Sequence, residues 1–336
     1  MTPYQSPLMR KPLPMQPSLS SIQSARQMLT KHLPATRLIK ALHLSELSGK
    51  TVSLKLETEL PTGSFKVRGA LYTLALKLRQ ASIQEVVASS TGNHGAAVAY
   101  AAKVLGIHAK IFLPEHSNPM KRGRIASFGA EITEKGRDIS DACELALQEC
   151  ASNPNAFFLN DATDPDLPSA TGVIGLEILE QCPLVREIYV PMGDSALIRG
   201  VAAAAKQISP QVKIIGVQAE RAPSYYLSWK RGEAVGTESC DTIADGLATR
   251  TPVQTNVESI RELVDNVVLV SERELLLAVD TLLLEEHVLA EPAGAASTAA
   301  LLKPENLLTS ADEVVLVVSG ANISRAVLRR SIQLDK

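Results

Sequence analysis

Short apolar runs alternate along the chain with longer segments in which apolar residues recur at helical spacing. The short runs have the length and composition of strands buried on both faces; they are 52–57, 85–89, 108–113, 156–159, 187–191, 213–219, 266–270 and 313–318. The longer segments predict helices: one starting near Lys66, and 21–31, 93–105, 119–128, 138–151, 167–181, 197–208, 272–287, 294–302 and 323–332. This alternation predicts an α/β protein whose parallel sheets are covered by helices on both faces.

Glycines mark the ends of two of these helices. Gly106 and Gly129 follow the last apolar positions of their segments, and glycine suits the left-handed backbone that often follows a helix. Ligands of such folds bind in loops beyond the carboxyl ends of the strands. We therefore expect functional residues in those loops.

Composition limits the possible partners. The 336-residue chain has a formal net charge of -2 and a pI near 6.3, so it has no basic field for nucleic acid or an acidic membrane. No apolar run reaches the roughly 18 residues of a membrane span. Residues 1–16 lack the apolar stretch of a signal peptide, and we expect a mobile N-terminal arm over residues 1–20.

Cysteine and histidine usage predicts neither disulfides nor a metal site. None of the four cysteines forms a CxxC pair, which is typical of reduced thiols in a cytoplasmic protein. The six histidines are scattered without the spacing of metal ligands. We therefore expect a cytoplasmic protein that needs no metal ion.

Two loops in the first half carry candidate chemistry. Lys66 lies in the segment PTGSFKVRGA, where a strand and turn give way to a helix. A desolvated amine there can form a Schiff base with an aldehyde cofactor; the alternative is a surface lysine at a helix start. The segment SSTGNHG, residues 89–95, opens the next helix. Its hydroxyls and free N–H groups suit a carboxylate, or they simply cap the helix.

Two loops in the second half carry weaker indications. Residues 192–197 (MGDSAL) lie between a strand and an alanine-rich helix, where small residues let backbone amides approach a phosphate. Ser319 ends the last strand just before a helix. Its hydroxyl either bonds a ring heteroatom or acts as an N-cap.

The four loops occur in the order and spacing of the fold-type II pyridoxal-phosphate (PLP) enzymes. From about Leu33 to Leu328 the chain resembles the threonine/serine dehydratase and serine racemase group, most specifically in SFKxRGA and SxxGNHG, and also in TIADGLA (242–248) and EPAGA (291–295). The resemblance implies the tryptophan synthase β-subunit-like fold with two parallel-type α/β domains. The expected large PLP-binding domain spans 21–82 and 161–336, the small inserted domain spans 83–160, and the expected assembly is a homodimer.

The resemblance also implies roles for individual residues. Lys66 would form the Schiff base with the cofactor and then act as base at the substrate Cα. The remaining cofactor contacts would come from Phe65, Asn93, Gly193, Asp194, Ser195, Ala196, Leu197 and Ser319. The substrate would be held by Ser90, Thr91, Asn93, His94 and Glu291. A hydroxyl at the pyridine nitrogen, from Ser319, does not keep that nitrogen protonated, which favours expulsion of a β-leaving group over transamination.

The chain departs from the family pattern at three places. Asp194, Ser195 and Ala196 interrupt the usual glycine cluster of the phosphate loop, and we expect Asp194 to face outward or into the helix N-terminus. Thr91 replaces the serine that serves the racemase as second acid/base; it either protonates the face opposite the lysine or bonds its own backbone. The segment from Glu220 resembles the racemase cation site, but Tyr226 replaces an aspartate, so no magnesium is predicted.

The favoured function is a PLP-dependent ammonia-lyase that eliminates water from a small β-hydroxy amino acid such as L-threonine or L-serine. Lys66 would remove the Cα proton, and the enamine released would hydrolyse to a 2-oxo acid and ammonia. The alternatives are an amino-acid racemase, a dehydratase of another substrate such as 3-hydroxyaspartate, a sulfhydrylase-type β-replacement enzyme, and a cofactor-binding regulator without turnover. His94 disfavours the sulfhydrylase, which usually has threonine there.

Overall fold

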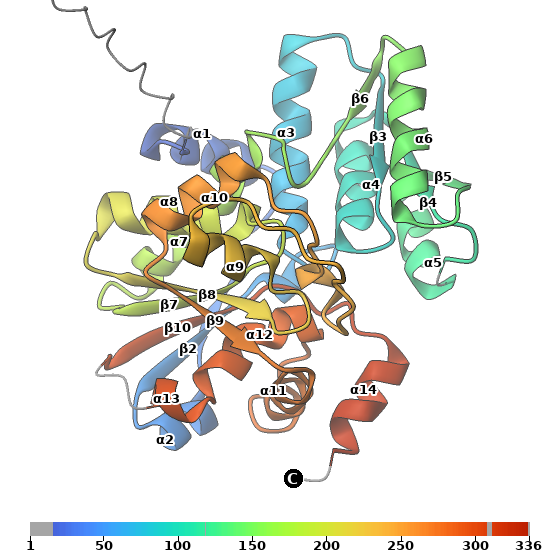
Figure 1. Cartoon of the computed structure of the whole chain (residues 1–336). Coiled ribbons are helices and arrows are strands. Elements are labelled where there is room, and N and C mark those ends of the chain that lie inside the picture. Colours follow the sequence, from blue (N-terminus) through green and yellow to red (C-terminus); the bar gives the residue numbers. More distant parts are fainter. Residues whose placement is uncertain (1–15, 118, 308–310, 335–336) are drawn as a thin grey trace, which may run out of the picture.

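Two sheets and the helices around them make up the part of the chain that the structure describes. The computed structural model describes residues 16–117, 119–307 and 311–334. Figure 1 shows the larger sheet wrapped by helices, with the smaller sheet and its helices beside it. None of the helices described in these ranges is long and apolar enough to span a membrane.

The larger sheet has six strands in the order β1-β2-β10-β7-β8-β9. Every pairing is parallel except that of β1 with β2, which is antiparallel. The strands are β1 (Leu38–Lys40), β2 (Thr51–Leu56), β7 (Glu187–Pro191), β8 (Lys213–Ala219), β9 (Asn266–Val270) and β10 (Glu313–Val318). The central strands are buried almost throughout, which explains why they are continuous apolar runs in the sequence.

The smaller sheet has four parallel strands in the order β5-β4-β3-β6. They are β3 (Glu85–Ser89), β4 (His108–Leu113), β5 (Glu131–Glu134) and β6 (Ala156–Phe158). All of them come from one continuous stretch of chain. Helix α3 (Lys66–Gln80) leads into this stretch and packs on α4 (Asn93–Leu105).

Helices cover both faces of the larger sheet. The remaining α-helices are α1 (Leu19–Leu29), α2 (Leu42–Ser48), α5 (Pro119–Ser127), α6 (Ile139–Ser152), α7 (Leu167–Gln181), α8 (Ala196–Ile208), α9 (Ser224–Arg231), α10 (Gln254–Leu263), α11 (Glu272–Leu284), α12 (Pro292–Leu301), α13 (Pro304–Leu307) and α14 (Arg325–Ile332). The 3₁₀ turns are η1 (Glu57–Glu59) and η2 (Asp245–Leu247). Helices α7 and α8 pack closely on one another, and α11 packs on α12.

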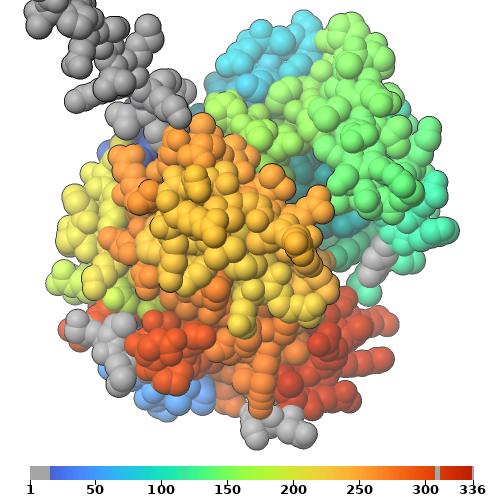
Figure 2. Space-filling model, in the orientation of Figure 1, coloured from blue at the N-terminus to red at the C-terminus, as the bar shows by residue number. Residues whose placement is uncertain are grey.

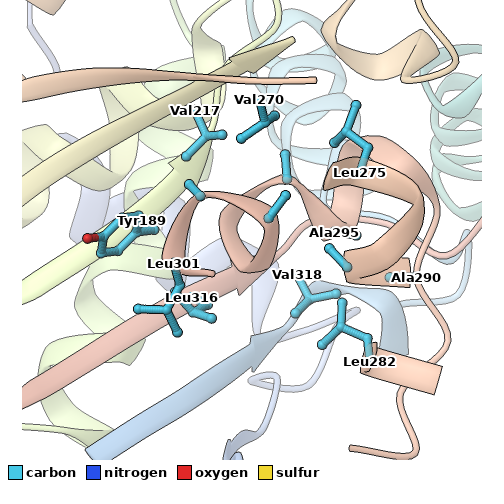
Figure 3. Close-up of a cluster of buried hydrophobic side chains, with 14 of the residues drawn as sticks. Tyr189, Val217, Val270, Leu275, Leu282, Ala290, Ala295, Leu301, Leu316 and Val318 are labelled. Atoms are coloured by element: carbon cyan, nitrogen blue, oxygen red, sulfur yellow. The ribbon is translucent and has the colours of Figure 1, made fainter. Parts of the chain in front are cut away.

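Helix α12 lies in the centre of a large apolar cluster. It contacts strands β7, β8, β9 and β10 and is buried along its whole length. Figure 3 shows its Ala295 and Leu301 surrounded by side chains from the strands and α11, including Val217, Val270 and Leu275. A helix buried on all sides shows no amphipathic stripe, and its small residues let the backbone come close to the sheet.

The sequence predictions agree with most of this architecture. Every predicted strand is present, and the predicted strands pair in parallel as expected. Strand β2 begins and ends one residue earlier than predicted, and β6 ends one residue earlier. The short strands β1 and β5 and the helices α2, α9, α10 and α13 were not predicted. The edge strands β1 and β5 are only partly buried, so their sequences lack the apolar pattern by which the buried strands are recognised.

The N-terminal boundary is a correction. Helix α1 begins at Leu19 with Ser18 as its N-cap, so Leu19 and Ser20 do not belong to a mobile arm as predicted. The buried Ile22 and Ala25 of this helix pack in the cluster that includes α3 and α4 residues, which ties the segment to the protein. Residues 1–15 of the predicted arm lie outside the described residues. The predicted domain boundaries stay a prediction.

Candidate active site

The loops after β2 and β10 lie side by side because the two strands pair in parallel, with Val318 opposite Leu56. The Phe65 N–H donates to the Ser319 carbonyl (3.1 Å), and the Ala321 N–H donates to the Gly63 carbonyl (2.9 Å). These bonds hold Lys66, the first residue of α3, next to Ser319. The two residues are far apart in the sequence and come together only through the sheet order.

Two glycines allow further loops to approach. A Cβ on Gly193, after β7, would lie 2.2 Å from the carbonyl oxygen of Gly246 in η2. A Cβ on Gly294 in α12 would lie 2.2 Å from the carbonyl oxygen of Gly320. Real side chains cannot occupy such positions, so glycine is required at both. The TIADGLA and EPAGA segments thus meet the phosphate loop and the Ser319 loop.

These loops surround a cleft with an empty volume of about 450 Å³. It is lined by the residues Phe65, Lys66, Asn93, Asp161, Pro191, Gly193, Asp194, Ser195, Ala196, Leu197, Gly246, Leu247, Glu291, Ala293 and Ser319. A second cavity of about 270 Å³ adjoins it and shares Phe65, Lys66, Asp161 and Ala196. Figure 2 shows the surface hollowed between the green segments of the smaller sheet and the yellow and orange segments.

Lys66 forms an ion pair with Asp161, a residue that the sequence prediction missed. Lys66 Nζ lies 2.5 Å from Asp161 Oδ2. Burial lowers the pKa of Lys66, but the carboxylates of Asp161 and Asp194 outweigh it and raise that pKa above its usual value. Burial raises the pKa of Asp161, but Lys66 and His94 outweigh it and hold that pKa well below the usual range. These opposite shifts favour the charged form of both groups.

The N-terminus of α4 offers free backbone N–H groups. Its N-cap, Gly92, makes no side-chain cap, so the alternative of a helix capped by its own hydroxyls is wrong. The Ser90 hydroxyl accepts a hydrogen bond from the Gly92 N–H (3.2 Å). Neither Ser90 nor Thr91 lines the two cavities. His94 Nε2 lies 3.0 Å from the Leu159 carbonyl oxygen, and its Nδ1 lies 3.9 Å from Asp161 Oδ2.

Asn93 is held between two side chains from the second half of the chain. Its amide nitrogen donates to Glu291 Oε1 (2.6 Å), and its amide oxygen accepts from Asn322 Nδ2 (2.5 Å). Asn322 also donates to the Thr62 carbonyl (3.0 Å). Burial raises the pKa of Glu291 despite the bond from Asn93. Glu291 and Asn322 hold the Asn93 amide in one orientation at the wall of the cleft.

The loop of residues 192–197, the candidate phosphate loop, brings the N-terminus of α8 to the cleft. The N-cap Ser195 has a left-handed backbone (φ 73°) and no side-chain cap bond. Its hydroxyl accepts from Arg199 Nε (3.1 Å), which leaves the hydroxyl hydrogen available as a donor. Burial lowers the pKa of Arg199 to about 10. A buried guanidinium one turn into the helix adds positive charge behind a loop that is already suited to an anion.

The orientation of Asp194 is a correction. It does not face outward or into the helix N-terminus as expected; it lines the cleft, and its Oδ1 accepts from the Thr249 hydroxyl (2.9 Å). Thr249 follows η2, so contact between these two distant loops determines the orientation. Burial and the neighbouring Asp161 raise the pKa of Asp194, although Lys66 lowers it. A raised pKa reduces the repulsion that this carboxyl group would exert on a phosphate.

Ser319 does not cap the final helix, so that alternative is also wrong. The N-cap of α14 is Ser324, whose hydroxyl accepts from the Val327 N–H (3.2 Å). Ser319 is buried and lines the cleft. Within the described part of the chain, its hydroxyl has no hydrogen-bond partner. An unpaired hydroxyl on a residue that lines the cleft is available to bond a ligand atom.

The side chains and helix ends that line the cleft fit the chemistry of PLP. The cleft offers an amine for the aldehyde, helix N–H groups with a serine hydroxyl for the phosphate, and the unpaired Ser319 hydroxyl for a ring atom. Phe65 and Asn93 lie at its walls. Among the lining carboxyl groups, that of Asp194 lies in the loop after β7 and opposes a phosphate held there. Its hydrogen bond to Thr249 and its raised pKa reduce that conflict.

The segment from Glu220 shows another use for the residues that resemble a cation site. Glu220 is exposed, the Ser224 hydroxyl donates to the Thr249 carbonyl (2.6 Å), and Lys230 Nζ lies over the Tyr226 ring at 4.6 Å. Across residues 16–117, 119–307 and 311–334, no three His, Cys, Asp or Glu side chains are grouped as metal ligands. The four cysteines form no disulfide.

The sequence prediction missed four residues, and only one of them, Asp161, lies where a general rule would have indicated it. Asp161 lies just after β6 at the carboxyl edge of the smaller sheet, in the loop that joins it to α7. The rule that ligands bind beyond strand ends would have indicated it. Arg199, Thr249 and Asn322 had no comparable indication, since each acts through a contact that the local sequence pattern does not show.

Comparison with known proteins agrees with this site. Residues 29–320 match the family of pyridoxal-phosphate dependent enzymes. The chain is 38% identical over 302 residues to an L-threonine ammonia-lyase of Geobacter sulfurreducens, covering 90% of this chain and 75% of that one. It superposes on maize serine racemase (TM-score 0.89, 29% identity, 95% and 97% covered). It also superposes on the processed form of threonine deaminase isoform 2 from Solanum lycopersicum, with a TM-score of 0.87 and 28% identity. That superposition covers 98% of this chain and 93% of the other.

The match spans most of the chain, and the family is described by the cofactor whose chemistry suits the cleft. The fold, the lysine at the start of α3 and the comparisons agree. The predictions of the family, of the fold class and of PLP as the cofactor are confirmed. The chain belongs to the family of pyridoxal-phosphate dependent enzymes.

Proposed function

We propose that the protein is an ammonia-lyase that eliminates water from L-threonine or L-serine and yields a 2-oxo acid and ammonia. The observation that carries this proposal is that the amine of Lys66 and the neutral hydroxyl of Ser319 line the same cleft. The relatives named L-threonine ammonia-lyase support the same activity. The test is release of 2-oxo acid from serine, threonine, 3-hydroxyaspartate and bulkier 3-hydroxy amino acids.

Different residues of this chain bind the cofactor, move the Cα proton and hold the substrate carboxylate. Bound PLP supplies an electron-withdrawing ring that makes the Cα proton of an attached amino acid acidic. Lys66 holds the cofactor and, once freed as a neutral amine, takes the Cα proton. The free N–H groups at the start of α4 hold the substrate carboxylate, beside Ser90, Thr91 and His94. Ser195 and the N-terminus of α8 hold the phosphate, with Gly193, Ala196 and Leu197.

Ser319 is expected to set the electronic state of the ring. Ser319→Asp places a carboxylate against the pyridine nitrogen and raises its pKa, since an opposite charge at hydrogen-bond range favours the protonated form. A protonated ring retains the Cα charge instead of expelling the β-hydroxyl. We expect 2-oxo acid release to fall about tenfold or more, an increase of roughly 1.4 kcal/mol in the barrier, with a new long-wavelength absorbance.

The matched control is Ser324→Asp, because Ser324 caps α14 and aspartate is an equally good cap. This control should keep the wild-type rate and spectrum. If Ser319→Asp also released ammonia at the wild-type rate with an unchanged spectrum, Ser319 would have no contact with the ring nitrogen.

Racemisation is the second candidate function, favoured by the structural similarity to maize serine racemase. Thr91 is the residue in question. We expect Thr91→Ala to reduce D-serine formation from L-serine at least about tenfold, while 2-oxo acid release falls less, because only the reprotonation of the opposite face requires this hydroxyl. Chiral chromatography of the products measures both. Thr163→Ala is the control, because Thr163 is exposed and lines neither cavity. D-serine formed by Thr91→Ala at the wild-type rate would contradict the role of Thr91.

We also propose that the enzyme works in the cytoplasm as a homodimer. The free cysteines suit a reducing compartment. Leu42 of α2 and Leu284 of α11 are exposed (73% and 48%), and their helices lie close together, since the Leu44 N–H donates to Glu286 (2.8 Å). Light scattering of the purified protein tests the dimer.

A further inference from the structure

We infer that Asp161 determines substrate specificity: it binds the β-substituent of the substrate, favours a hydrogen-bond donor or a cation there and excludes a side-chain carboxylate. This inference rests on the function proposed above and names the substrate class more closely. Asp161 lines both cavities and lies 2.5 Å from Lys66 Nζ. The amine of Lys66 marks where the substrate Cα reacts, so Asp161 lies within reach of groups attached to that carbon.

The ion pair with Lys66 cannot persist through the reaction. An ammonium donates three hydrogens, whereas a nitrogen joined to the cofactor carries at most one, and the amine must be neutral to take a proton. The remaining basic side chain near Asp161 among the lining residues is His94, at 3.9 Å. A partly buried carboxylate that loses its partner must gain another donor or a proton. A donor on the β-substituent supplies that partner.

The carboxyl groups that line the cleft also disfavour a carboxylate on the substrate side chain. Asp161, Asp194 and Glu291 line it, and Lys66 is the one Lys or Arg among the lining residues of the described chain. The α-carboxylate and the phosphate each have a helix N-terminus, at α4 and α8. A side-chain carboxylate near Asp161 would face like charge at short range, which argues against 3-hydroxyaspartate as the substrate.

Three compounds differ in the charge carried on Cβ: L-serine is neutral there, L-2,3-diaminopropionate is cationic, and 3-hydroxyaspartate has an added carboxylate. Turnover of the cationic analogue balances as follows. Lys66 takes the Cα proton, the Cα–H electrons form the Cα=Cβ bond, and the Cβ–N bond breaks with its electron pair going to the departing ammonia. Water then hydrolyses the released 2-aminoacrylate, so each molecule yields pyruvate and two molecules of ammonia.

The experiment titrates PLP-loaded wild-type and Asp161→Asn protein with each compound, below the pKa of the β-ammonium group. Cofactor absorbance reports binding, and 2-oxo acid release reports turnover. We expect wild-type enzyme to bind 3-hydroxyaspartate at least about tenfold more weakly than L-serine, and the cationic analogue at least as tightly. In Asp161→Asn the ratio of cation to anion affinity should fall about tenfold or more, as expected for removal of a charge at close range.

Asp166→Asn is the matched control, because Asp166 lies in the same loop and pairs with Lys77 (3.3 Å) but lines neither cavity. It should keep the wild-type ratios. Asp161→Ser and a thermal unfolding curve serve where the asparagine variant folds poorly. An unchanged ratio in both Asp161 variants, or equal wild-type affinity for L-serine and 3-hydroxyaspartate, would overturn the inference. Absence of 2-oxo acid from every compound would refute the proposed lyase alone, since the affinity ratios still test Asp161.

Discussion

Replacement of Lys66 by alanine is expected to lower kcat/KM for 2-oxo acid release by at least about 10³-fold, because one amine both anchors the cofactor and moves the Cα proton. The variant should also lose the borohydride-reducible link to PLP. Removing the ammonium leaves Asp161 without its partner at 2.5 Å. The pKa of Asp161 should therefore rise from its depressed value, and the loss of this ion pair is a side effect that a second variant must control.

Lys66→Arg is the control for that side effect. Arginine keeps a positive charge beside Asp161 but does not form a Schiff base at neutral pH, since its guanidinium is not deprotonated. This variant should unfold near the wild-type temperature and still lack turnover and the reducible link. Mass spectrometry after borohydride treatment checks the link. A cofactor still attached covalently in either variant would assign the linkage to another lysine.

Replacement of Arg68 by methionine is expected to lower the free energy of unfolding by about 3–5 kcal/mol. Arg68 is buried in α3 and donates to both Glu57 (2.8 and 2.9 Å) and Glu177 (2.8 and 2.9 Å). Lys55 is the other cation of this group, 2.6 Å from Glu177. Methionine fills much of the space but leaves two buried carboxylates with one cation.

The loss of unfolding free energy caused by Arg68→Met should become smaller as the pH falls. Burial raises the pKa of Glu177, but Arg68 and Lys55 outweigh it and lower that pKa below its usual value in the folded protein. Ionised Glu177 therefore stabilises the fold at pH values above the pKa that it has in the unfolded chain. This stabilisation is lost as the pH falls from the unfolded-state pKa of Glu177 to its lower folded-state pKa. Without Arg68 the carboxyl can protonate more readily, so the difference between variant and wild type should narrow in acid.

Urea unfolding followed by circular dichroism over a pH series measures both effects. The control is Arg37→Met, because Arg37 pairs with Glu59 at the surface with 70% of its side chain exposed. Such a pair contributes at most about 1 kcal/mol. A loss in Arg68→Met no larger than that of the control would show that the buried group adds little to stability.

The sequence alone determined most of the regular structure and indicated Lys66 as the candidate reactive amine. Strands such as β3 and β10 were predicted to the residue, because a strand buried on both faces must be apolar along its length. Lys66 was predicted from a local motif, and the structure places it at the start of α3 beside Ser319. These features depend on neighbours in the chain, which the sequence shows directly.

Only the tertiary structure decided which charged and polar side chains of the site lie next to one another. Asp161 lies 95 residues from Lys66, and Thr249 lies 55 residues from the Asp194 that it orients. These side chains lie close together because parallel strands bring their carboxyl ends to one edge and the two sheets face a common cleft. No local periodicity encodes that proximity. The orientation of Asp194, the ion pair of Lys66 and the free hydroxyl of Ser319 could therefore be found only in the folded chain.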